Sequence, residues 1–148
     1  MIKSFVINGS TYYLGDCFDF LGFEFRWGVS RRGNDIIKRR TSRKKFRTSL
    51  RNLNEWCRKN RSLPLRDFFK ILNSKLRGYY NYYGVIGNYR SLAELFHQAR
   101  KILYKWLNRR SQKRSFDYVG FSKVLEYYKI EKPRITEVIT NQLHFNFS

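Results

Sequence analysis

The chain has 148 residues, of which 31 are Lys or Arg and 11 are Asp or Glu, so its formal net charge is +20. A chain of this length can bury roughly 70% of its unfolded surface, which is enough for one domain with a real core. Aromatic residues make up 18% of it, which argues against a disordered chain. This excess of positive charge predicts a polyanionic partner, with nucleic acid ahead of an anionic membrane surface.

The cellular location follows from what the sequence lacks. No segment approaches the run of about 20 apolar residues that a membrane span needs, and the N-terminus has no apolar signal-peptide run. Cys17 and Cys57 stand apart, without the CxxC pairs of a zinc site, so we expect both to pack as small apolar residues. We therefore expect a cytoplasmic protein of a bacterium, or one of an organellar matrix or stroma, and not a secreted one.

The first 40 residues have the pattern of β-hairpins. Asn8-Gly9 lies between two short runs of strand-forming residues and is a strong two-residue hairpin signal. Aromatic residues then occupy every second position from 23 to 27, as in a half-buried strand. A turn at Gly33-Asn34 completes a second expected hairpin over Phe20–Arg39, with Arg31 and Arg32 near its tip.

From residue 41 the apolar residues recur with the period of a helix. Thr41 or Ser42 is the expected N-cap of this first helix. An apolar stripe and a basic stripe run along it, and successive members of each stripe lie about one helical turn apart. They consist of Phe46, Leu50, Leu53 and Cys57 and of Arg43, Arg47 and Arg51.

Three further helices are expected. The second begins near Ser62-Leu63-Pro64 and ends at Gly84 or Gly87, and either Tyr79 or Tyr80 lies on its apolar face. A capping box over Ser91–Glu94 opens the third helix. Ser122 caps a short fourth helix that Pro133 closes, and the tail from Ile135 is an added strand or a partner-dependent arm.

These elements predict an α+β fold in which β-hairpins precede a bundle of three to four helices. We divide it into a hairpin segment over 1–40, a helical domain over 41–130 and a C-terminal arm over 131–148. The stretch Arg26–Arg66 holds 15 of the 31 basic residues but only two acids, Asp35 and Glu55. That bias is too one-sided for mixed ion pairing, and it favours phosphate binding over an ordinary solvated face.

The chain lacks the groups that catalysis would need. Its carboxylates are scattered, it has no Tyr-x-Asp-Asp, and it has no glycine loop of the kind that cradles phosphates. His97 and His144 have no Cys or carboxylate at a catalytic spacing. We expect no enzymatic activity in this chain alone, no cofactor and no metal site.

The sequence resembles the maturase-specific region, the thumb or domain X, of group II intron reverse transcriptases. The resemblance covers roughly residues 18–128 and depends on the order and spacing of several phrases. These are Phe20-Leu21-Gly22-Phe23, Leu72-Asn73, Arg77-Gly78-Tyr79-Tyr80-Asn81-Tyr82-Tyr83 and Trp106-Leu107-Asn108-Arg109-Arg110. Tyr79 stands where the family usually has Trp, and Thr41-Ser42-Arg43-Lys44-Lys45 replaces a Pro-Ser-Lys-Lys-like helix start.

The resemblance implies the RNA-binding half of a maturase, without fingers and palm and therefore without polymerase activity. We expect a stand-alone protein that clamps a group II intron or another large ribozyme-like RNA, stabilises its active fold and promotes splicing or mobility. Two alternatives stay open. The chain could be the thumb subunit of a split reverse transcriptase with a separate palm protein, or a general basic DNA- or RNA-binding scaffold. The oligomeric state stays undetermined.

Cationic side chains are the expected phosphate contacts, and exposed tyrosines are the expected platforms for unpaired bases. The expected phosphate contacts are Arg31, Arg32, Lys38, Arg39, Arg40, Arg43, Lys44, Arg47, Arg51, Lys75, Arg77, Arg109 and Arg110, and the expected base platforms are Tyr80, Tyr82 and Tyr89. For Tyr79 and Tyr83 we favour the core.

Overall fold

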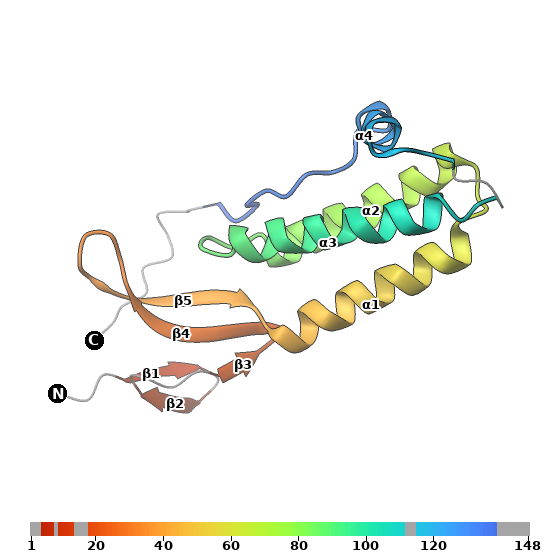
Figure 1. Cartoon of the computed structure of the whole chain (residues 1–148). Helices are drawn as coiled ribbons and strands as arrows, with labels where there is room; N and C mark the ends of the chain where they lie inside the picture. Colours follow the sequence, from red (N-terminus) through yellow and green to blue (C-terminus); the bar gives the residue numbers. More distant parts are fainter. Residues whose placement is uncertain (1–3, 8, 14–17, 112–114, 139–148) are drawn as a thin grey trace.

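The computed structural model describes residues 4–7, 9–13, 18–111 and 115–138. Within these residues strands come first and helices follow, so the predicted α+β fold is confirmed (Figure 1). The elements are β1 (Ser4–Ile7), β2 (Ser10–Tyr13), β3 (Phe18–Phe20), β4 (Phe23–Val29), β5 (Asp35–Thr41), α1 (Arg43–Asn60), α2 (Leu65–Tyr83), α3 (Tyr89–Leu107) and α4 (Tyr118–Tyr127).

Two antiparallel sheets form the strand region. β1 and β2 pair with Ser4 opposite Tyr13, which confirms the first hairpin, and Gly9 in the turn has a φ of +78°. The second sheet has the order β3-β4-β5. Its β4–β5 hairpin is also confirmed, but β5 continues two residues beyond the expected end at Arg39. Arg31 and Arg32 lie exposed at the tip, as predicted.

The aromatic stretch that opens the second sheet folds into two strands instead of one. Leu21 and Gly22 form a two-residue turn between β3 and β4, with φ values of 51° and 86°. Positive φ at both positions is typical of the tight turns whose twist suits a hairpin. The Tyr82 hydroxyl donates to the Leu21 carbonyl over 2.5 Å, and the Ser42 N–H donates to the Gly22 carbonyl over 2.8 Å. The turn is thereby attached to α1 and α2.

The starts of α1 and α2 were predicted correctly, because the residues that determine them are adjacent in the sequence. The Ser42 hydroxyl accepts from the Lys45 N–H over 3.3 Å, as expected, and α2 follows Pro64. The expected capping box of the third helix is wrong, because α3 already begins at Tyr89 and Ser91 lies inside it. Its N-cap residue is Asn88, whose side chain makes no capping bond.

The start of the fourth helix was also predicted wrongly. Asp117, and not Ser122, caps α4, and its carboxylate accepts from the Gly120 N–H over 2.7 Å. Ser122 lies within the helix, and its hydroxyl donates to the Tyr118 carbonyl. α4 ends at Tyr127, well before Pro133, and Lys129 then turns the chain with a φ of +49°.

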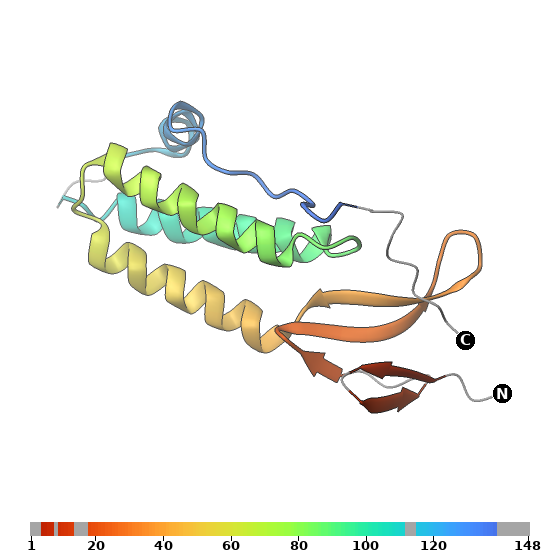
Figure 2. The same cartoon turned by 180° about the vertical axis from the view of Figure 1, so that it is seen from behind.

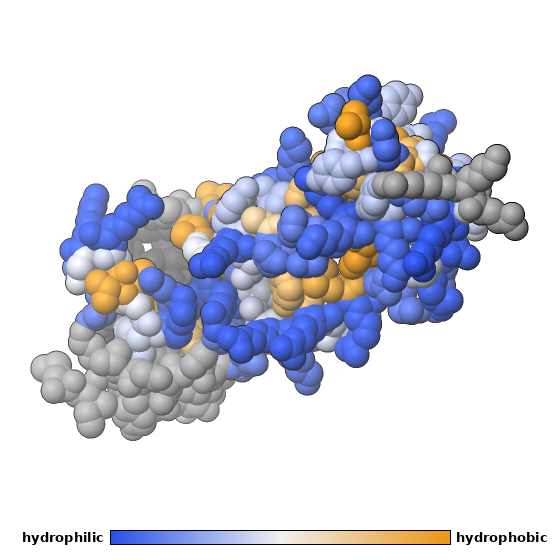
Figure 3. Space-filling view, viewed as in Figure 1, coloured by the Kyte–Doolittle hydropathy of each residue, from blue (hydrophilic) through white to orange (hydrophobic). Residues whose placement is uncertain are grey.

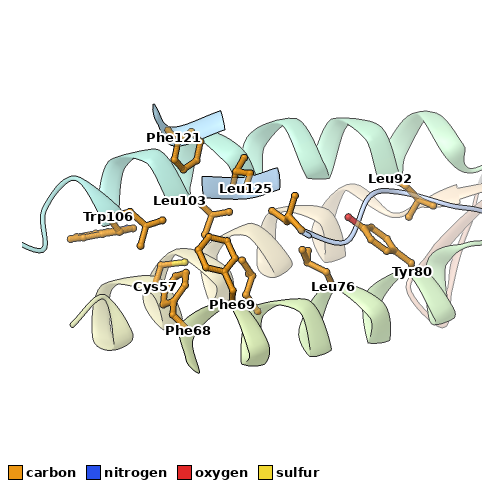
Figure 4. Close-up of a cluster of buried hydrophobic side chains, with 13 residues drawn as sticks. Cys57, Phe68, Phe69, Leu76, Tyr80, Leu92, Leu103, Trp106, Phe121 and Leu125 are labelled. Atoms are coloured by element: carbon orange, nitrogen blue, oxygen red, sulfur yellow. The ribbon is translucent and has the colours of Figure 1, made fainter. Parts of the chain in front are cut away.

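The core lies where α1, α2, α3 and α4 meet (Figure 4). Cys57 of α1, Phe68 and Leu72 of α2, and Leu103 and Leu107 of α3 are fully buried there. This confirms the expectation for Cys57, and burial raises the pKa of its thiol to about 12. Cys17 and His144 lie outside the described residues. In the described part of the chain, none of the helices has the length and apolar character needed to cross a bilayer.

The segment after α4 runs back along the helices toward the second sheet (Figures 1 and 2). Asn73 of α2 holds its beginning, because its amide accepts from the Glu131 N–H over 3.0 Å and donates to the Tyr128 carbonyl over 3.2 Å. Further on, the Glu137 carboxylate accepts from Arg39 of β5 and from the Ile86 N–H, each over 2.7 Å. Residues 135–138 form no strand, and the rest of the expected arm lies outside the described residues.

Candidate nucleic-acid interface

A basic hollow of about 570 Å³ lies where the β4–β5 hairpin meets the first turns of α1 and α3. Guanidinium groups from all of these elements line it. They belong to Arg26 on β4, Arg40 on β5, Arg43 and Arg47 on α1, and Arg90 on α3. Glu94 contributes the only carboxylate of the described lining. We refer to this feature as the arginine hollow.

The strand pairing places cations of the hairpin side by side. Arg26 lies directly opposite Lys38 in the register of β4 and β5. Like charges that face each other across strands are destabilising in the absence of an anion. Gly28, two residues along, leaves room for the stem of Lys38, since a Cβ there would lie 2.5 Å from the Lys38 Cε. The hairpin therefore concentrates positive charge on the side that faces the hollow.

Arg40 differs from its neighbours because it is held by a carboxylate. Glu24 lies opposite it across the strands, is only 8% exposed, and accepts from the Arg40 Nε over 2.9 Å and from its Nη2. Arg40 therefore lines the hollow in a fixed position, and Glu24 balances most of the charge of Arg40. Among the described residues, no carboxylate forms an ion pair with Arg26, Arg43, Arg47 or Arg90.

The ends of two helices add to the positive potential. Neither α1 nor α3 has an acidic residue in its first turn. The N-cap residue of α3, Asn88, is 1% exposed and uses its side chain elsewhere. Its Oδ1 accepts from the Thr41 N–H over 2.9 Å, and its Nδ2 donates to the Thr41 hydroxyl and the Tyr83 carbonyl over 2.9 and 2.8 Å. The first N–H groups of α3 thus lack a side-chain cap and favour a negative charge nearby.

The predicted phosphate contacts are only partly brought together. Arg40, Arg43 and Arg47 line the hollow, while Lys44 and Arg51 lie exposed further around or along α1. Arg26 and Arg90 were missed as site residues. Arg26 belonged to the recognised basic stretch, and Arg90 immediately precedes the misplaced capping box. Only the tertiary fold brings them within reach of α1.

Several other predicted contacts hold the protein itself. Arg39 pairs with Glu137 over 2.7 Å and Arg77 pairs with Glu131 over 3.3 Å. At the far end of α3, Arg110 donates to the Leu63 carbonyl over 3.0 Å. Arg109 lies over the ring of Trp106 and Lys75 over that of Trp56. By helix geometry, Arg109 and Arg110 lie about 30 Å from the hollow.

The tyrosines separate into one buried and two exposed candidates. Tyr80 is fully buried and donates to the Glu131 carbonyl over 3.0 Å, so the prediction that it stacks on a base is wrong. Tyr82 is 50% exposed, although one face of its ring stacks on Phe23 at 5.7 Å. Tyr89, at the start of α3, is 53% exposed. Tyr82 and Tyr89 therefore stay candidates.

On the face seen in Figure 3, hydrophilic side chains follow α1 and α3 on either side of an apolar strip. The family model described as group II intron, maturase-specific domain, matches residues 43–123, more than half of the chain. The chain belongs to this family. The resemblance is confirmed, whereas searches of curated proteins and of solved structures found no match.

Membership in this family indicates the function of the chain in general terms. The maturase-specific domain indicates a maturase-related, intron-associated role in RNA binding, with intron RNA as the partner. It is the maturase or thumb part of such proteins and not their catalytic polymerase part. The matched residues include α1, α2 and α3 and reach into α4, so they contain Arg43, Arg47 and Arg90 of the arginine hollow.

Proposed function

We propose that this maturase-specific domain clamps a folded group II intron, or a related ribozyme-like RNA, and stabilises its active fold. One observation carries the proposal. The arginine hollow gathers guanidinium groups from a sheet and two helices, and four of them form no ion pair with a carboxylate among the described residues.

The chemistry suits RNA because duplex RNA hides its base edges in a deep and narrow groove. Proteins therefore recognise it by its shape, its phosphates and its 2′-hydroxyls. Guanidinium groups bind phosphate oxygens in pairs, and rigid strands and helices hold them in a fixed arrangement. An intron fold that brings several backbone segments close together would gain stability from such a clamp, since the cations offset phosphate repulsion.

Binding to an intron RNA fragment, followed across a salt series, tests the proposal. If 6–10 phosphates are engaged, affinity should fall by about 10³–10⁵ between 50 and 200 mM salt. Replacing Arg43, Arg47 and Arg90 together by Ala should weaken binding and reduce the salt slope by roughly two to three. The matched control removes the same charge from exposed cations away from the hollow, Arg66, Lys70 and Lys101, and should change affinity much less.

The result contradicting the proposal is a flat salt response, or equal losses in the two triple variants. Equal affinity for structured RNA and duplex DNA at matched salt would instead favour a general basic scaffold. Comparing the thermal unfolding of the variants with that of the wild type separates lost contacts from lost folding. Splicing of the intron at low Mg²⁺, with and without the protein, then tests whether binding stabilises the active fold.

One observation favours the second candidate, the thumb subunit of a split reverse transcriptase. The turn between β3 and β4 exposes Leu21 by 67% beside the half-exposed Tyr82, so the end of the second sheet carries apolar surface. A palm polypeptide would dock at this place. Co-purification with such a protein, together with polymerisation only when both are present, would decide for this candidate.

A further inference from the structure

We propose that the arginine hollow accepts a single unpaired nucleotide that is extruded from the RNA, and that it favours guanine. This inference rests on the proposed function, because it names the part of the RNA that enters the site. Three features carry it: the volume of the hollow, the aromatic ring and the carboxylate among its cations, and the hydrogen bonds that hold the surrounding elements together.

The size of the hollow suits a small molecule better than a duplex backbone. Its volume of about 570 Å³ falls in the range of roughly 300–1,000 Å³ that small-ligand sites occupy. A phosphate backbone that passes over a convex helix needs no hollow of this volume. An unpaired base, in contrast, can be splayed out of its helix and inserted into a protein site.

The lining contains two groups that a pure phosphate site would not use. Phe46, half-buried on α1, offers an aromatic ring between the arginines of the same helix. Glu94 on α3 places a carboxylate among guanidinium groups, where it would repel a phosphate. Both fit a nucleotide, since bases stack on aromatic rings and donate hydrogen bonds from their edges.

The carboxylate of Glu94 is exposed and is hydrogen-bonded to another side chain of α3. Its Oε1 accepts from the Gln98 amide over 3.0 Å, one helical turn away. A base edge with two adjacent N–H donors suits a carboxylate best, and the Watson–Crick edge of guanine presents this pair through N1 and N2. Uracil presents one N–H between two carbonyl oxygens, which a carboxylate repels. The expected preference is therefore guanine first and uracil last.

The phosphates on either side of the nucleotide would meet the arginines. Arg43 and Arg47 lie one turn apart on α1, and Arg90 faces them from α3 beside its uncapped N–H groups. Asn88 fixes this spacing, because its three hydrogen bonds join the end of β5 to α2 and α3. A site whose walls are held before binding loses little entropy when the ligand enters.

Hairpin RNAs that differ only in one bulged nucleotide test the inference. We would measure the affinity of the wild-type protein for RNAs with a bulged G, A, C or U and for a fully paired RNA, at constant salt. The bulged G should bind at least about fivefold more tightly than the paired RNA, the lower end of what one stacked base contributes. Bulged U should gain least.

Two variants assign the preference to the hollow. Phe46→Leu should lower the affinity for bulged RNA more than that for paired RNA and so remove the preference for bulged RNA. Glu94→Gln should abolish the preference of G over U, whereas Glu126→Gln on α4, an exposed carboxylate outside the hollow, should keep it. Thermal unfolding of each variant shows whether its fold is intact.

Equal binding of all five RNAs by the wild type would overturn the inference, as would a Phe46→Leu variant that loses paired and bulged RNA alike. Neither result touches the proposed function if the salt dependence and the loss in the arginine triple variant persist. Failure of every RNA to bind in a salt-dependent way would overturn both. The two proposals therefore fail separately.

Discussion

Replacing Asn88 by Ala should destabilise the protein more than any other single polar substitution that we consider. The side chain is 1% exposed and makes three hydrogen bonds, to the Thr41 N–H, the Thr41 hydroxyl and the Tyr83 carbonyl. Ala leaves two backbone groups of this buried site without these partners. Each unsatisfied buried group costs about 1–3 kcal/mol, so the free energy of unfolding should fall by about 2–6 kcal/mol.

Urea unfolding followed by circular dichroism measures this change, with equal slopes for variant and wild type as a condition. Asn81→Ala is the matched control, because Asn81 is exposed on α2, and it should stay within about 0.5 kcal/mol. A loss below 1 kcal/mol for Asn88→Ala would refute the reasoning. It would mean that water or a shifted neighbour satisfies the freed groups.

The remaining predictions concern a turn, a thiol and an ion pair. Gly22→Ala should cost more stability in urea than Gly33→Ala, since both have positive φ but only at Gly22 would a Cβ lie 2.7 Å from another side-chain atom. In a Cys17→Ser background, the buried thiol of Cys57, whose pKa is raised to about 12, should react with iodoacetamide only after unfolding. Partial burial raises the pKa of Glu137, but its hydrogen bonds and the nearby guanidinium outweigh this and lower it. Its contribution should therefore be present at neutral pH and lost as the pH falls below its ordinary value of 4.5, so Glu137→Gln should destabilise the protein at pH 7 and hardly at pH 3.

Elements whose determinants are local in sequence could be predicted. The Asn8-Gly9 hairpin, the hairpin with Arg31 and Arg32 at its tip, and the Ser42 cap each depend on a few adjacent residues. The same holds for the apolar stripe that buries Cys57. The division of the chain into 1–40, 41–130 and 131–148 stays a prediction.

Tertiary contacts determine the features of the fold that could not be predicted from the sequence. Asn88 has the residue type of an N-cap, yet its amide is taken by Thr41 and Tyr83, and Ser91 mimics a cap from inside the helix. Positive φ at Leu21 is unexpected for a residue with a branched side chain, and the hydrogen bond from Tyr82 helps to hold it. The bonds of Asn88 to Thr41 and of Tyr82 to Leu21 join residues 47 and 61 positions apart.

The candidate site was predicted in part for the same reason. Arg43 and Arg47 form a stripe that any helix would display. Arg26 and Arg90 join them only because the hairpin and α3 pack at the same end of α1. Tyr80 could not be separated from Tyr79 by periodicity alone, since adjacent residues on a helix differ by only 100° and both border the apolar face.

The distribution of the carboxylates explains how a chain with a net charge of +20 stays folded. Glu24, Glu131 and Glu137 pair with arginines of other segments. Among the described residues, no carboxylate forms an ion pair with Arg43 and Arg47 of α1 or with Arg31 and Arg32 of the hairpin tip. Repulsion among those cations opposes folding and favours an anionic ligand.

Salt should therefore have opposite effects on the stability of the free protein and on its affinity for RNA. Moderate salt should raise the melting temperature of the free protein by screening repulsion, while it weakens RNA binding by competing for the same cations.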